Sequence, residues 1–180
     1  RNIGFAMRSH DYLSGTVTQG WKAYNTTSDQ AYGLGDWSTE QIEGFLWHGH
    51  APGRSTAVGP MAEVVENSLQ FFTADDMHAL VTYLRAVSPA ESGNPADAIN
   101  LKPKDVLASN AVLPGPDESK ANLRGRQLFA GDCTGCHQWN GIGRQTDYAS
   151  LTGSHAVNDP AGTALVQVLI HGRNLRVGSQ

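Results

Sequence analysis

The feature that most constrains this chain is the stretch CTGCH, in which Cys133 and Cys136 lie two residues apart and His137 follows directly. Two thiols at this spacing on a helical turn can add to both vinyl groups of a porphyrin, while the adjacent imidazole binds the iron. The other interpretations are a redox dithiol and half of a zinc site. A zinc site needs four ligands, and the 180 residues hold no second cysteine pair. A redox dithiol would be expected in a βαβ context, which the sequence does not show. The motif therefore favours covalent haem c on Cys133 and Cys136, with His137 as the proximal iron ligand.

Charge and hydropathy argue against two other classes of function. The net charge is -4 and the basic residues are scattered, whereas phosphate contacts by basic side chains dominate nucleic-acid affinity. The longest mostly apolar run, residues 164–170, is far shorter than the roughly 20 residues that span a bilayer as a helix. We therefore expect neither a nucleic-acid partner nor a membrane-spanning segment.

A segment rich in proline and poor in large apolar residues divides the sequence. It covers residues 89–117 and is typical of a surface linker, because proline interrupts helices. The flanking parts, residues 1–88 and 118–180, are each of a size that usually needs a cofactor, metal or disulfide for stability. The sequence thus predicts two small domains joined by a linker.

The remaining segments show helical patterns, and none shows a convincing strand. One helix is expected from Thr73 as N-cap to Val87, and another from Ser38 to Gly49, with Gln41 completing a capping box. A third is expected to open at residues 159–160 and stop at Gly172, and a fourth to run from residue 122 into Cys133. We therefore predict an all-α fold.

The two halves share a weak repeat. Residues 45–50, FLWHGH, resemble residues 168–173, VLIHGR, so that His48 matches His171 and Gly49 matches Gly172. If the repeat is real, the first half lacks its own copy of CTGCH and the second half lacks its copy of Met61. Both units are then expected to be incomplete, with the missing parts before Arg1 and after Gln180.

Met61 is the second candidate iron ligand. It follows Gly59 and Pro60, outside the helical pattern, and a thioether on a loop between helices is a common axial ligand of low-spin haem. The alternative is that Met61 fills the core, which is the role expected for Met77. The histidines near helix ends are rival ligands, although histidine at a helix C-terminus is favourable for its own sake. They are His48, His50 and His171.

The stretches GLGDWSTEQIEGFL, VGPMAEVVENS and GRQLFAGDCTGCH resemble a known family. It comprises the multi-haem cytochrome c subunits of membrane-bound bacterial alcohol, aldehyde, gluconate and related sugar-acid dehydrogenases. The resemblance implies two cytochrome c-like haem domains, both apparently incomplete, with Met61 as axial ligand of the preceding haem and the methionine partner of His137 beyond Gln180. The family usually has proline where Tyr24 and Ala149 stand. At the latter position the backbone carbonyl often orients the proximal imidazole, so the resemblance gives Ala149 that role.

We therefore expect an electron-transfer subunit with no catalytic residue of its own. It would accept electrons from a dehydrogenase catalytic subunit and pass them toward membrane quinone, in the periplasm and peripheral to the inner membrane. Two alternatives remain open, a dihaem peroxidase-like enzyme with five-coordinate iron at His137, and a haem-based gas-binding module.

Overall fold

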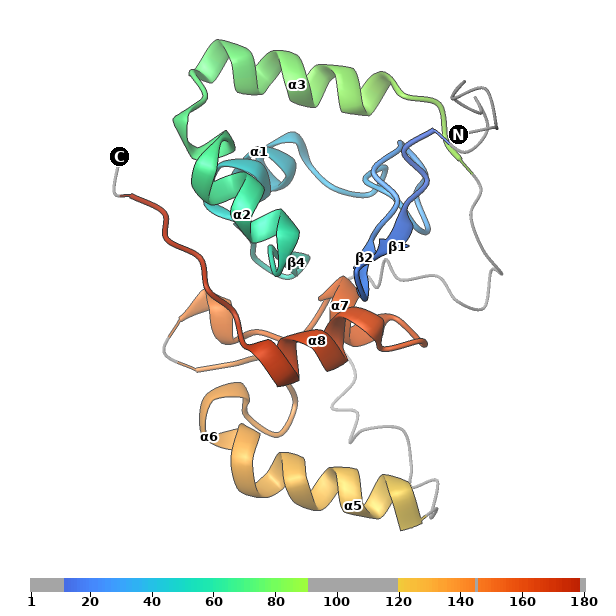
Figure 1. The fold of residues 1–180 in the computed structure, drawn as a ribbon, viewed down its shortest axis with the longest axis vertical. Coiled ribbons are helices and arrows are strands. Elements are labelled where there is room, and N and C mark those ends of the chain that lie inside the picture. Colours follow the sequence, from blue (N-terminus) through green and yellow to red (C-terminus); the bar gives the residue numbers. More distant parts are fainter. Residues whose placement is uncertain (1–11, 91–119, 145, 179–180) are drawn as a thin grey trace.

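The computed structural model describes residues 12–90, 120–144 and 146–178, which we treat as a first region (12–90) and a second region (120–178). Most of the predicted linker, residues 91–117, lies outside the described residues. Helices account for most of the regular structure in both regions (Figure 1). None of the helices in the described parts of the chain has the length and hydrophobicity needed to cross a membrane.

The first region is built from three α-helices, and the sequence predicted two of them correctly. Helix α1 is capped by Ser38, whose hydroxyl accepts from the Gln41 backbone at 3.2 Å while the Gln41 side chain accepts from the Ser38 backbone at 3.0 Å. Helix α3 begins after Thr73, whose hydroxyl accepts from the Asp76 backbone at 3.2 Å. The helices are α1 (Thr39–His48), α2 (Pro60–Asn67) and α3 (Ala74–Ala86), with a 3₁₀ turn, η2 (Leu69–Phe71), between the last two.

Helix α2 was not predicted, and it corrects the expected position of Met61. Pro60 is the first residue of α2, where a missing backbone N–H costs nothing because the first turn has no intrahelical acceptor. Met61 is therefore in the first helical turn rather than on a loop. The preceding Gly59 has φ 51°, and a Cβ there would lie 2.5 Å from the indole ring of Trp21. Glycine at this position lets α2 begin against that ring.

The prediction that the chain contains no strand is wrong, because two short antiparallel hairpins are present in the first region. Strands of two or three residues are too short for alternating hydrophobicity to reveal them. In the first hairpin the turn residues Gln19 and Gly20 both have positive φ, 50° and 79°, as a two-residue hairpin turn requires. The hairpins are β1 (Thr16–Thr18) with β2 (Trp21–Ala23), and β3 (His50–Ala51) with β4 (Ser55–Thr56).

The apolar core of the first region lies between its three helices. Ile42 of α1, Val65 of α2, and Met77 and Val81 of α3 are each at most 1% exposed. The core role expected for Met77 is therefore confirmed. Trp37, Leu46 and Leu69 belong to the same cluster, and α1 contacts α2, η2 and α3.

The second region is a series of short helices, and the third predicted helix begins later than expected. Asp159 and Pro160 belong to a turn in which the Asp159 carboxylate accepts from the Ala161 backbone at 3.2 Å. Gly162, with φ 61°, is the N-cap, and the helix starts at the next residue. The elements are α5 (Lys120–Leu128), a π-helical turn η4 (Phe129–Cys133), α6 (Thr134–His137), a 3₁₀ turn η5 (Asp147–Ala149), α7 (His155–Asn158) and α8 (Thr163–His171).

The two regions are in contact. Figure 1 shows α7 and α8 lying between the first region and the pair α5 and α6, with the C-terminal segment running back along the first region. Leu175 and Val177 pack against the first core, and the Arg173 guanidinium donates to the Ala57 carbonyl at 3.2 Å. The Gln70 side chain accepts from the Gly178 backbone at 3.0 Å. Residues 173–178 therefore bind to the first region.

The repeat between the halves is visible in local structure. Helix α1 ends at Gly49 with φ 68°, and its N–H donates to the Phe45 carbonyl. Helix α8 ends at Gly172 with φ 73°, and its N–H donates to the Val168 carbonyl. Both helices thus end on a glycine of positive φ preceded by a histidine.

Candidate functional site

The CTGCH motif lies on one helical turn that begins at the end of η4. The widened turn of η4 carries α5 into α6, and Thr134 reinforces the junction by donating from its hydroxyl to the Ala130 carbonyl at 2.8 Å. Cys133 is partly buried and Cys136 is exposed, and both are free thiols. Residues three apart on a helix lie on the same side. A Cβ added at Gly131 or Gly135 would have no atom of the chain within 4 Å, so the space beside both cysteines is open.

The imidazole of His137 is oriented by the backbone of residue 149. Its Nδ1 lies 2.6 Å from the carbonyl oxygen of Ala149. A carbonyl can only accept, so Nδ1 carries the proton and Nε2 keeps its lone pair for a metal ion. The structure therefore places Ala149 in the position that the family resemblance implied, although alanine stands where proline is usual.

A tight loop holds Ala149 against the motif. The Arg144 backbone donates to the Cys136 carbonyl at 2.8 Å, and the Gly143 backbone donates to the His137 carbonyl at 3.1 Å. Gly143 has φ 88°, and a Cβ there would lie 2.5 Å from the carbonyl carbon of Ala149. Glycine at 143 thus permits the close approach that brings the Ala149 carbonyl to the imidazole.

Apolar side chains of the second region face solvent. Among the described residues of this region, Ala164 is the buried apolar side chain, at 1% exposure. A set of exposed apolar side chains of this size on a soluble domain usually marks a surface that something else covers. The side chains that are at least 40% exposed are Leu123, Leu128, Trp139, Ile142, Tyr148, Val166, Leu169 and Ile170.

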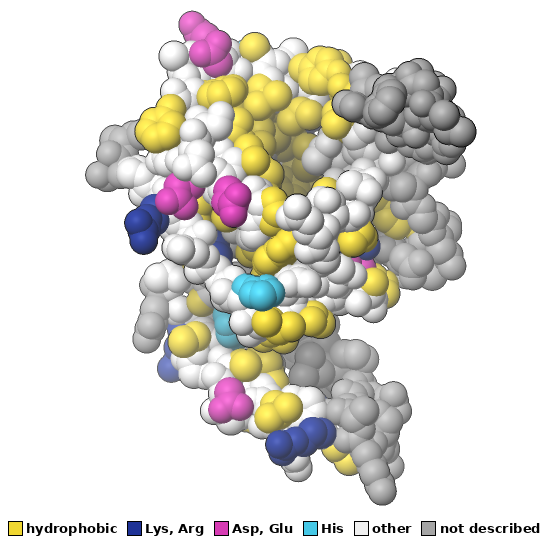
Figure 2. All heavy atoms as spheres, in the orientation of Figure 1, with side chains coloured by type: hydrophobic (Ala, Val, Ile, Leu, Met, Phe, Trp, Pro, Cys, Tyr) yellow, Lys and Arg dark blue, Asp and Glu magenta, His cyan; other side chains and the backbone are white. Residues whose placement is uncertain are grey.

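A second candidate site is a cavity of about 200 Å³ against the first region. Met61 contributes to its wall, together with the aromatic rings of Trp21, Tyr24, Trp37 and Phe45. Figure 2 shows hydrophobic side chains gathered in a hollow on one face of the molecule. The structure thus places Met61 at an apolar cavity but far from CTGCH in sequence and on another helix.

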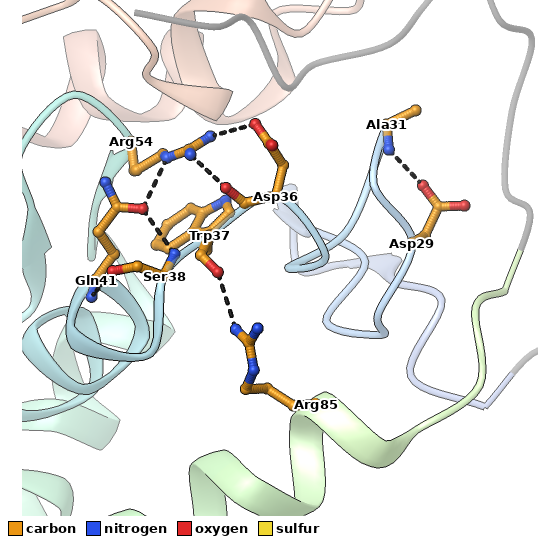
Figure 3. Close-up of polar contacts among 8 residues, drawn as sticks. All are labelled: Asp29, Ala31, Asp36, Trp37, Ser38, Gln41, Arg54 and Arg85. Atoms are coloured by element: carbon orange, nitrogen blue, oxygen red, sulfur yellow. Dashed lines mark hydrogen bonds and ion pairs between the residues drawn. The ribbon is translucent and has the colours of Figure 1, made fainter.

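Trp37, which lines this cavity, carries an unsatisfied donor. Its indole N–H is buried and has no acceptor among the described residues. Its position is fixed on other sides, because the Arg85 guanidinium donates to the Trp37 carbonyl at 2.9 Å and the Arg54 guanidinium lies 5.8 Å from the ring centroid (Figure 3). A buried donor without an acceptor costs about 1–3 kcal/mol.

Arg54 is itself held by polar contacts from the start of α1. Its guanidinium donates to the Gln41 side chain at 3.1 Å and to the Asp36 carboxylate at 3.2 Å, and also to the Asp36 carbonyl (Figure 3). Gln41 is the same residue that completes the capping box of α1 with Ser38. The N-terminus of α1 therefore fixes the cation that lies over Trp37.

His155 of the second region also lines this cavity. Its ring contacts the rings of Tyr24 and Trp37 edge-on, at centroid distances of 5.2 Å and 5.6 Å. Burial, with the positive charges of Arg54 and Lys22, lowers the pKa of His155 to about 4. The imidazole is therefore neutral at pH 7. Sequence reasoning found no distinguishing context for His155, because its partners are remote in sequence and no local pattern reveals such a contact.

Asp159 anchors the same segment. Its carboxylate accepts from the Lys22 ammonium at 2.8 Å and its side chain is 1% exposed. Burial, followed by the charge of Asp159, raises the pKa of Tyr24 well above its usual value. Lys22 of the first region thus binds Asp159 of the second.

The rival histidine ligands lie near helix ends, as expected. His48 and His171 are exposed last residues of α1 and α8. His50 follows α1 directly, and its Nδ1 lies 2.9 Å from the Thr56 hydroxyl. Among the described contacts, none joins one of these three histidines to His137 as the hydrogen bond from His137 to the Ala149 carbonyl does.

Comparison with known proteins defines the class of the second region. Residues 123–173 match the family model for cytochrome c. This range contains CTGCH, the loop to Ala149 and helix α8. A cytochrome c domain is therefore present, and the match implies covalently bound haem c.

Curated relatives extend the similarity to the first region. The chain is 31% identical over 177 residues to the fructose dehydrogenase cytochrome subunit of Gluconobacter japonicus, covering 96% of this chain and 36% of that protein. It is 31% identical over 178 residues to the alcohol dehydrogenase (quinone) cytochrome c subunit of Gluconacetobacter polyoxogenes, covering 94% and 36%. It is 29% identical over 173 residues to the gluconate 2-dehydrogenase cytochrome c subunit of Pantoea cypripedii, covering 93% and 36%. The chain is similar to cytochrome c subunits of dehydrogenases and spans 36% of the length of these relatives.

Proposed function

We propose that this chain is an electron-transfer component of a dehydrogenase complex, with haem c attached through Cys133 and Cys136. The observation that carries the proposal is the 2.6 Å contact between His137 Nδ1 and the Ala149 carbonyl, beside two free thiols on the same turn. It leaves Nε2 of His137 as the metal-binding atom. The family match over residues 123–173 supports it independently.

The residues of this site fit haem c in three respects. The thiols of Cys133 and Cys136 are available for thioether bonds, and the space beside them is open. The Ala149 carbonyl holds the His137 ring in one orientation and raises the basicity of Nε2. The exposed apolar side chains of α8 can cover a largely apolar ring. Haem would supply a reversible one-electron couple, whose potential the protein sets through ligands and burial.

We further propose that the cavity at Met61 covers one face of a second haem. At about 200 Å³ it is smaller than the roughly 300–1,000 Å³ of pockets that enclose a whole ligand, so it would cover part of the haem only. The Met61 thioether would be the axial ligand, and the aromatic rings of Trp21 and Trp37 in the cavity wall fit the largely apolar face of a porphyrin. The chain contains only Cys133 and Cys136, so the thioether bonds of this haem would come from cysteines outside residues 1–180.

The proposed electron path runs from a dehydrogenase catalytic subunit, through these haems, toward membrane quinone. Its support is the similarity to cytochrome subunits of fructose, alcohol (quinone) and gluconate dehydrogenases. We place the protein in the periplasm, peripheral to the inner membrane, because bacteria attach haem c on that side of the membrane.

The attachment is tested by expressing the chain with a c-type maturation system and extracting it with acidic acetone. Haem should stay with the wild-type protein and be lost from Cys133→Ala. Gly135→Ala is the matched control, since it lies between the cysteines, leaves their spacing unchanged and meets no neighbour within 4 Å. It should retain haem. Extractable haem in the wild type, or bound zinc, would refute the proposal.

The electron-transfer role is tested by reducing the haem-loaded protein and mixing it with a short-chain quinone or with hydrogen peroxide. Oxidation by the quinone without turnover of peroxide supports a relay. Sustained consumption of peroxide would instead favour the peroxidase-like alternative.

A further inference from the structure

Part of the wall of the cavity at Met61 comes from the second region. Within residues 153–159, His155 and Ala156 line the cavity together with residues of β2, β4 and α2. The wall therefore comes from a segment that follows the CTGCH motif in the chain, although the cavity belongs to the other region. This arrangement differs from two independent haem domains joined by a linker.

The segment is held closely against the first region at both of its ends. At its start, Gly153 has φ 73°, and a Cβ there would overlap the Gly53 carbonyl in the turn between β3 and β4. At its end, the buried Asp159 carboxylate pairs with Lys22 of β2 at 2.8 Å. A buried carboxylate is costly unless it is paired, and in the docked segment Lys22 supplies that pairing.

Between these anchors, His155 contacts the two rings that shape the cavity. It is 4% exposed and meets Tyr24 and Trp37 edge-on, at interplanar angles of 69° and 72°. Trp37 in turn meets Phe45 edge-on at 5.8 Å. Aromatic rings in contact prefer this edge-on geometry. The orientation of Trp37 is thus set jointly by Arg54, Phe45 and His155.

Trp37 matters because its ring lines the cavity beside Met61. The burial of a haem and the exclusion of water around it both influence its potential. Replacing the His155 ring, which packs against Trp37, would therefore change the potential of a haem bound at Met61.

We propose that His155 is a positioning residue for the haem at Met61, supplied by the second region, and that it acts through its ring contacts with Trp37 and Tyr24. The inference rests on the proposed haem at Met61 and adds that this haem pocket is completed by the neighbouring unit. His155, which follows the CTGCH motif in the sequence, then influences the potential of the haem at Met61 more than that of the haem on His137.

The test is a redox titration of the holoprotein produced from its complete gene. The haem at Met61 is identified first, as the one whose potential and methionine-to-iron charge-transfer band change in Met61→Ala. His155→Ala and His155→Gln both remove the ring, and both should shift the potential of that same haem. His155→Phe keeps a planar ring against Trp37 and Tyr24 and should return the potential close to the wild-type value. The haem on His137 should not change in any of the three variants.

His171→Ala is the matched control, because it removes an exposed histidine of the second region that does not line the cavity. It should leave the Met61 haem unchanged. The inference is overturned if His155→Gln leaves all potentials unchanged, if the shift falls on the His137 haem, or if Phe fails to restore the potential. Failure of the underlying function would look different, since the wild-type protein would then lack covalent haem or show no haem that responds to Met61→Ala.

Discussion

The two regions share the same glycine-terminated helix end but differ in what their apolar side chains contact. In the first region, α1, α2 and α3 surround a cluster that includes Ile42, Val65 and Met77, each at most 1% exposed. In the second region, α8 is more apolar in sequence yet exposes Leu169 and Ile170 at 72% and 67%. The first region has a core made of protein, whereas the described second region carries apolar side chains without one.

This difference indicates how a short segment with C-x-x-C-H is stabilised. Domains of about 60 residues bury little apolar area and are marginally stable, and a cofactor commonly supplies what is missing. Fully burying a Val, Leu or Ile side chain contributes roughly 1.5–3 kcal/mol. Covering Val166, Leu169 and Ile170 with haem would therefore stabilise the fold by several contributions of this kind. We conclude that the second region is shaped to fold around its haem.

The largest expected effect compares a core residue of one region with an exposed residue of the other. In the haem-free chain, Met77→Ala should lower the free energy of unfolding by about 2–5 kcal/mol, because the side chain is fully buried. Leu169→Ala should change it by no more than about 0.5 kcal/mol, since Leu169 is 72% exposed. Urea denaturation measures both. An equal loss for Leu169→Ala would show that the second region already has a protein core.

The next effect concerns pH and the histidine that joins the regions. The pKa of His155 is about 4 in the folded chain, below its usual value near 6.5. Between these values the unfolded chain binds a proton that the folded chain does not. The contribution of His155 is therefore complete above about pH 6.5 and falls, by up to about 3 kcal/mol, as the pH decreases toward 4. His155→Phe should show a shallower loss of stability over this range. Identical pH profiles would mean that His155 is not buried between the regions.

The smallest effect compares the two matched helix ends. Gly49 is in the left-handed region (φ 68°, ψ 20°), where an alanine should cost about 1–2 kcal/mol. Gly172 has φ 73° and ψ -171°, a region essentially restricted to glycine, where an alanine should cost about 1–3 kcal/mol. At Gly49 the new Cβ would also overlap the Leu175 side chain, whereas at Gly172 it would meet no such neighbour within 4 Å. Leu175→Ala should therefore relieve part of the loss caused by Gly49→Ala and none of the loss caused by Gly172→Ala, as measured by urea denaturation of the single and double variants. No relief at Gly49 would indicate that Leu175 does not pack against the first region.

The sequence predicted those features that depend on local patterns. The caps at Ser38 and Thr73 and the glycine at the end of α1 define helices through neighbouring residues, and all three are confirmed. The resemblance also placed the Ala149 carbonyl correctly, because the motif and its loop are adjacent in sequence. The haem ligands themselves remain predictions.

The features that were missed depend on contacts between distant residues or on very short elements. The hairpins have strands of two or three residues, and α2 begins with a proline after an unusual glycine, so neither shows a recognisable period. His155 packs against Tyr24 and Trp37 through the tertiary fold alone. The expectation of separate halves did not foresee that residues 153–159 would bind the first region.

Haem c on Cys133 and Cys136 should supply the core that the second region lacks, and hydrogen exchange read by mass spectrometry tests this directly. The haem-loaded chain is compared with Cys133→Ala/Cys136→Ala, using α1 and α3 as the internal reference. We predict that the peptide with CTGCH carries the mass of one haem in the loaded chain, and that the amides of α5, α6 and α8 exchange much faster in the variant while α1 and α3 stay protected. Unmodified cysteines in the loaded chain, or equal protection of α8 in both proteins, would contradict the account.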